Sequence, residues 1–285
     1  MAEQKKKPTV TNAAGYEEAK AAAQQGKPAI PQGSATGLRV GAVILWVLAF
    51  VFEILAVLII FGKLNITFMP TMWLLIILIV LDLACVILGS QLWKKANHIR
   101  PASEKNKALF WIWNNLGVIV ACFAFLPLIV IMLSNKNLDK KTKVVATVAA
   151  VVALLIGGAA SIDYNPISAE QQEAAMVELG AADVYWTPFG KVYHTCVDED
   201  GDEYCPHLNR SEALTRGTVE QAIAAGRTRM CSWCARHDGI DTSGILMDDG
   251  STEAVSEAVA ETTPELDSEA EGVADAVADL FDAAA

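Results

Sequence analysis

Hydrophobic residues gather in four long runs in the first part of the chain. They cover Val40–Phe61, Met72–Trp93, Ala108–Leu133 and Val144–Ser161. A helix needs about 20 apolar residues to cross a hydrocarbon core about 30 Å thick, and the first three runs exceed that length. The fourth run is shorter and rich in Ala, Val and Gly. The pattern predicts an α-helical membrane protein with four transmembrane helices in residues 39–163.

Composition and aromatic placement point to a lipid bilayer around these runs. The chain is 53% hydrophobic and has a mean hydropathy of +0.34, although it also contains long polar segments. Tryptophans stand near several ends of the runs, as they do at membrane–water interfaces; they are Trp73, Trp93, Trp111 and Trp113. We therefore expect a multi-pass protein of the cell membrane rather than a soluble helical bundle.

Lys and Arg residues around the runs predict a cytoplasmic N-terminus. Six basic residues precede the first run and five lie between the second and third runs, whereas the first loop contains only Lys63. The loop before the fourth run breaks this rule, since it carries Lys136, Lys140, Lys141 and Lys143. Either the fourth run returns the chain to the cytoplasm against the rule, or one run does not fully cross. The total count of Lys and Arg residues favours the cytoplasm for the N-terminus and, with four spans, for the C-terminal part.

Two carboxyl groups interrupt the apolar runs. Glu53 lies near the middle of the first run and Asp82 near the middle of the second, so antiparallel helices would hold them at similar depth. An ionisable group inside a bilayer costs several kcal/mol unless it is paired, protonated or in contact with water. Glu53 and Asp82 are therefore candidates for a shared proton. The other interpretation is a protonated pair whose hydrogen bond holds two helices together.

Both ends of the chain are predicted to be disordered. Residues 1–38 show no sustained apolar period, although a short helix from Tyr16 to Gln25 is an alternative. Residues 241–285 contain no Lys or Arg and hold much of the acidity behind the net charge of -11. Near its end, Val273, Val277, Leu280 and Phe281 share one helical face, which predicts a short terminal helix able to dock on a protein partner.

A helical stalk and a small α+β module are predicted between the membrane runs and the acidic end. In the stalk, residues 164–182, a capping box begins at Ser168 and Gly180 suits a helix end, so we expect a helix over Ala169–Leu179 that spaces the module from the bilayer. In the module, residues 183–240, alternating residues around a Pro188-Phe-Gly190 turn predict a β-hairpin. A second capping box at Thr218 predicts a short helix.

The module holds four of the six cysteines, and their spacing predicts a metal site. Cys231-Ser-Trp-Cys234 is a C-x-x-C turn, which points two thiolates at one ion. His194 at the end of the second hairpin strand and Cys205 complete a closed tetrahedral set of the structural zinc type. Cys196 is an alternative to His194, and His207 is a lesser candidate. Two disulfides or a redox pair are the other interpretations of the cysteines.

The order Tyr193-His194, Cys205-x-x-Leu, Gly217-Thr-x-x-x-Ala and Cys231-x-x-Cys234 resembles the metal-binding domain of Ada-type DNA repair proteins. It is more similar still to a version found in uncharacterised bacterial membrane proteins and some secreted nucleases. The resemblance covers about fifty residues and implies a metal bound at His194, Cys205 and the two C-x-x-C thiols. The first ligand differs, because His194 stands where the repair domain has a cysteine.

Charge argues against DNA repair, because nucleic-acid binding relies on cation-rich surfaces and the module holds nine acidic against six basic residues. No nucleic-acid partner is expected. The sequence predicts a multi-pass membrane protein, not an enzyme, that presents a structural zinc-binding module for protein interaction or sensing. The alternative is a small proton-coupled transporter or membrane sensor that uses Glu53 and Asp82.

Overall fold

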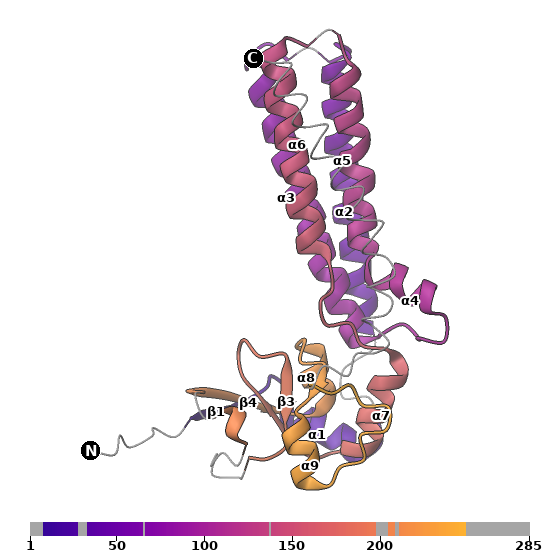
Figure 1. The fold of residues 1–285 in the computed structure, drawn as a ribbon, viewed down its shortest axis with the longest axis vertical. Coiled ribbons are helices and arrows are strands. Elements are labelled where there is room, and N and C mark those ends of the chain that lie inside the picture. The colour runs from indigo at the N-terminus through magenta and orange to yellow at the C-terminus, as the bar shows by residue number, and fades with distance from the viewer. Residues whose placement is uncertain are drawn as a thin grey trace, which may run out of the picture.

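A long helical bundle and a small mixed module make up the described part of the chain (Figure 1). The computed structural model describes residues 8–27, 33–64, 66–136, 138–197, 205–208 and 211–248. Residues 198–204, between two of the predicted ligands, and the predicted terminal helix lie outside the described residues.

Four helices form the bundle, and each is long and apolar enough to cross a membrane. They are α2 (Gly33–Ile60), α3 (Thr71–Ile99), α5 (Leu116–Ser134) and α6 (Lys140–Ser161). Phe125 and Leu128 of α5 are buried inside the bundle. Large apolar side chains also cover its outside: Ile44 is 62% and Leu155 66% exposed. An apolar outer surface of this extent suits lipid rather than water.

The third apolar run is not one helix, so that prediction is wrong. The run divides into α4 (Lys107–Asn114) and α5, and Asn115 between them has non-helical angles of φ -103° and ψ 16°. The carbonyl of Trp113 accepts hydrogen bonds from Trp93 Nε1 and Asn97 Nδ2 of α3. These tertiary bonds fix the break, and α4 turns away to the side of the bundle (Figure 1).

The module is built on a five-stranded sheet with the order β1-β4-β2-β3-β5. The predicted hairpin is present as the antiparallel strands β2 (Val184–Trp186) and β3 (Val192–His194). β4 (Ala213–Gly217) pairs with β2, and β5 (Arg229–Met230) runs parallel to β3. A short 3-10 helix, η1 (Pro206–Leu208), and the helices α8 (Val219–Ala224) and α9 (Ser232–Asp238) complete it.

The N-terminal segment belongs to this sheet, so the prediction of a disordered tail is wrong for residues 8–27. β1 (Thr9–Asn12) pairs in parallel with β4, and the helix considered as an alternative is α1 (Tyr16–Gln24). Asp183 accepts hydrogen bonds from Tyr16 and Lys20 of α1 and from Arg216 of β4. The segments before and after the bundle therefore meet at one end of it.

The predicted stalk is also part of the module. The helix α7 (Ala169–Leu179) has the expected capping box, but Ala175 and Leu179 are buried against the core around Val184. Its first residue donates a backbone hydrogen bond to Ala102 of the bundle loop. The helix does not hold the module away from the bundle; it packs between them.

The module continues past its predicted end at residue 240. Ile245 packs in the module core, and the backbone of Met230 bonds to Leu246 and Asp248. The Asp248 carboxylate also accepts a hydrogen bond of 2.7 Å from the backbone N–H of Ser232 at the start of α9. These backbone bonds make residues 241–248 an ordered edge of the module rather than part of an acidic tail.

Polar contacts join the ends of α3 and α6 where the bundle meets the module, and the His98 carbonyl there accepts a hydrogen bond from Gln172 of α7. His98 of α3 lies 3.1 Å from the carboxylate of Asp163, just after α6. Lys94 donates to the carbonyls of Ala160 and Ile162 at the end of α6. Both contacts lie beside the module, so the last turns of α3 and α6 form its base.

Replacing Asp183 with Asn should loosen the N-terminal segment by about 1–3 kcal/mol, because a partly buried carboxylate with three donors would lose its charge. Burial opposes ionisation of Asp183, but the hydrogen bonds from Tyr16, Lys20 and Arg216 outweigh it and lower its pKa. A depressed folded-state pKa contributes stability above the unfolded pKa of about 4, and this is lost as the pH falls through the folded value.

Amide hydrogen exchange of residues 9–24 in the full chain would measure this loosening. The Asp183→Asn variant should exchange faster than the wild type at neutral pH, and the difference should shrink in acid. Glu212→Gln, a nearby exposed carboxyl outside the network, is the matched control. Equal exchange in both variants would contradict the assigned role of Asp183.

Candidate metal centre

Four elements of the module bring the predicted ligands together. His194 ends β3, and Cys205 directly precedes η1. Cys231 follows β5 as the N-cap residue of α9, and Cys234 lies in the first turn of that helix. All four side chains are buried. The site is therefore made of a strand end, the residue before η1 and the start of α9.

The donor atoms are spaced as a tetrahedral ion requires. The sulfurs of Cys205 and Cys231 are 3.8 Å apart, and the Cys234 sulfur is 3.7 Å from His194 Nδ1. Bonds of about 2.3 Å to sulfur and about 2.0 Å to nitrogen place such donors about 3.6–3.8 Å apart around one ion. All four atoms lie within 4.8 Å of one another. This buried cluster could hold a metal ion.

Burial and mutual hydrogen bonds shift the pKa values of the three clustered thiols. Burial raises the pKa of Cys205, and a hydrogen bond with Cys234 raises the pKa of Cys231. The same hydrogen bond lowers the pKa of Cys234. Cys231 is the donor, and its hydrogen bond stabilises the thiolate form of Cys234. Buried thiolates need a cation or a proton, and a divalent ion would replace the shared protons.

Cys196 and His207 lie beside the four-donor cluster rather than in it. The Cys196 sulfur is 3.6 Å from His237 Nδ1 and 3.4 Å from Asp238, in a second group of donors. His207 Nδ1 is 3.3 Å from the Cys231 sulfur, but its side chain is exposed. The structure thus places His194 among the four donors, whereas Cys196 lies next to that cluster, with its sulfur 3.8 Å from the Cys234 carbonyl.

All six cysteines are free thiols in the structure. The sulfurs of Cys205 and Cys231, 3.8 Å apart, are far beyond the bond length of about 2.05 Å in a disulfide. The arrangement is one of separate thiol donors.

The two bundle carboxyls lie on adjacent helices. Asp82 of α3 is 1% exposed, and neither of its oxygens has a hydrogen-bond partner among the described residues. Glu53 of α2 is also buried and is close enough to act on Asp82 electrostatically. The geometry leaves an unsatisfied acid inside the bundle, which is a costly arrangement if the group is charged.

Three polar residues near the metal cluster were missed by sequence reasoning. His237 and Asp238 follow the C-x-x-C turn by three and four residues, so their helical spacing was a usable signal. Asp248 was assigned to an acidic tail, and nothing local distinguishes it from the acids that follow it.

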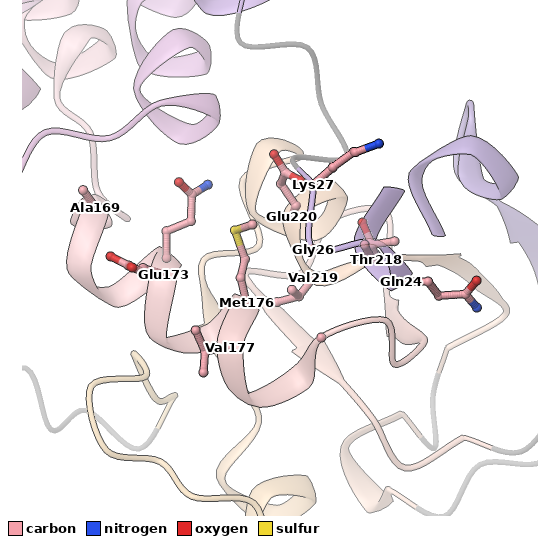
Figure 2. Close-up of a pocket in the computed structure, with 13 residues that line it drawn as sticks. Gln24, Gly26, Lys27, Ala169, Glu173, Met176, Val177, Thr218, Val219 and Glu220 are labelled. Atoms are coloured by element: carbon pink, nitrogen blue, oxygen red, sulfur yellow. The ribbon is translucent and has the colours of Figure 1, made fainter. Parts of the chain in front are cut away.

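A cavity of about 620 Å³ lies elsewhere in the module, between α7, α8 and the end of α1 (Figure 2). Met176 and Val219 give it an apolar side, while Lys27, Glu173 and Glu220 contribute charge. None of the four clustered donors lines it. The cavity and the metal centre are separate features.

Comparisons of the chain with models of protein families, with curated proteins and with solved structures found no match. The resemblance to Ada-type domains therefore stays a prediction, and the site is assigned on its geometry.

Proposed function

We propose that this protein is a multi-pass membrane protein whose module, held together by structural zinc, serves protein interaction or sensing and is not an enzyme. One observation carries the proposal: four buried protein donors lie within 4.8 Å of one another, which is enough to complete the shell of a tetrahedral ion. A catalytic zinc site keeps a position for water or substrate, whereas a structural site is closed. The resemblance to Ada-type domains supports the same ion and ligands.

The donor set favours zinc. Three thiolates and one imidazole are soft ligands, and zinc accepts them in tetrahedral geometry without redox chemistry. When bound, the ion would contribute folding free energy to a module whose strands are only two to five residues long. His194, Cys205, Cys231 and Cys234 would hold it.

We place the module on the cytoplasmic side. Because β1 pairs with β4, the N-terminal segment and the module share one end of the bundle. That end has eight of the thirteen Lys and Arg residues between positions 8 and 161, and the opposite end has five. The excess follows the positive-inside rule despite the basic third loop. A reducing cytoplasm would also keep the thiols available for metal.

Removal of one ligand should release the ion and unfold the module. Cys205→Ser should lose tightly bound zinc and expose residues 184–238 to protease, because a structural ion supplies folding free energy. Cys196→Ser, a neighbouring buried cysteine outside the cluster, should retain about one tightly bound zinc per chain. Elemental analysis of the detergent-purified chain after dialysis against a chelator measures the ion.

Cobalt distinguishes a structural site from a catalytic one. One equivalent of Co²⁺ in the tight site should give a four-coordinate spectrum that added azide does not change. A spectrum that shifts with azide would show an open position and overturn the non-enzymatic assignment. Absence of metal together with oxidised thiols would overturn the metal site itself.

Membrane orientation can be tested with single introduced cysteines. Phe189, at the hairpin turn, is 99% exposed, and Lys63 is exposed at the opposite end of the bundle. In intact cells an impermeant maleimide should label Lys63→Cys but not Phe189→Cys, which should react only after permeabilisation. The reverse pattern would place the module outside the cell.

A second candidate function, proton coupling, is favoured by the unsatisfied Asp82 beside Glu53. An isolated acid inside a membrane bundle is a functional candidate because a structural role alone would be served by a neutral side chain at lower cost. This function would use the bundle and leave the module as a regulator.

Purified protein in liposomes with a pH-sensitive dye tests proton coupling. Wild-type protein should carry protons along a pH gradient, and Asp82→Asn should abolish the flux while the protein stays monodisperse. Asp139→Asn, an exposed acid in the loop before α6, should retain it. Wild-type flux no greater than that of empty liposomes would remove this function.

A further inference from the structure

A second group of potential ligands lies beside the structural site. Cys196, just after β3, faces His237 and Asp238 at the end of α9. The Cys196 sulfur is 3.6 Å from His237 Nδ1 and 3.4 Å from each carboxylate oxygen of Asp238. His237 Nδ1 is in turn 2.8 Å from Asp238 Oδ1.

The spacing of this group fits an ion. Donor atoms of sulfur, nitrogen and oxygen around one tetrahedral zinc lie about 3.3–3.6 Å apart. The two separations that involve sulfur match this range, and only the nitrogen–oxygen pair is closer. A small widening of that pair, which now shares a proton, would admit the ion.

Neighbouring side chains orient two of these ligands. Thr195 Oγ1 donates a hydrogen bond of 2.5 Å to Asp238 Oδ2. The ring of Trp233 stacks on His237, with centroids 4.9 Å apart and planes 17° apart. Such outer contacts fix the direction of metal ligands and tune their affinity. The group is thus partly preorganised rather than a chance meeting of flexible side chains.

Exposure distinguishes this group from the first cluster. Cys196 is buried, but the side chains of His237 and Asp238 are 52% and 31% exposed. Three protein donors therefore stand on one side of the position and solvent on the other. An ion here would keep a water ligand and exchange with the medium, unlike an ion enclosed by four buried donors.

We propose that Cys196, His237 and Asp238 form a second, exchangeable site for a divalent ion of the zinc class. Binding would form a bond from the ion to the Cys196 sulfur and release the thiol proton to solvent. The ion would link the segment after β3 to the end of α9. The module would then sense the availability of the metal that the first cluster holds permanently.

Metal titration of the full chain in detergent tests this site. With the buried cluster filled by one equivalent of Zn²⁺, calorimetry with further Zn²⁺ should show a second, weaker equivalent. Asp238→Asn should weaken it by about 10–100-fold or more, since a ligand is lost without a change in shape. Cys196→Ser should do the same, and both variants should retain the first equivalent.

His207→Ala is the matched control, because His207 stands in a different group with Cys231 and Asp248. The His207→Ala variant should bind the second equivalent of Zn²⁺ as tightly as the wild type does. Absence of a second equivalent in the wild type, or its loss in His207→Ala with retention in Asp238→Asn, would overturn the proposal. Failure of the structural site would be seen separately, as loss of the first equivalent.

Discussion

The packing of three thiols and an imidazole within 4.8 Å of one another is the constraint on which the module depends. β5 has two residues and β2 and β3 have three each, so the sheet alone contributes few hydrogen bonds. Small cores of this kind need additional stabilisation, such as a disulfide or a structural metal ion. An ion held by the cluster would tie the end of β3, the start of η1 and the start of α9 together beside Tyr193 and Met230, both fully buried.

A second constraint comes from the pairing of the two ends of the described chain. β1 precedes the bundle and β4 follows it, yet they are neighbours in one sheet. An even number of membrane crossings is the arrangement compatible with that pairing. The Asp183 network reinforces it, since its donors come from α1 and β4. In a membrane, orientation of the bundle and assembly of the module would therefore be linked, because neither β1 nor β4 could change sides without breaking their pairing.

Features with local causes could be predicted from the sequence. The capping boxes at Ser168 and Thr218, the hairpin and the C-x-x-C turn depend on residues a few positions apart. The β1–β4 pair joins residues about two hundred positions apart. Thr9–Asn12 lacks the alternation of apolar and polar residues that would predict a strand. Likewise, the break at Asn115 depends on donors from Trp93 and Asn97 on another helix. Cys196 stayed an alternative to His194 because both lie near the end of a strand whose last residue the sequence does not define.

Helix α9 explains how two different kinds of site can stand side by side. Its N-terminal end supplies Cys231 and Cys234 to the interior, where no water can replace a lost donor, so all four positions must be protein. One turn later the same helix reaches the surface, and His237 and Asp238 can be hydrated when no ion is bound. Because of this difference in burial, an ion at the buried end would stay bound and an ion at the exposed end would exchange with solvent. An ion at the exposed end would therefore act on a helix that is already fixed at its start, which confines any movement to the last turn of α9 and the segment after β3.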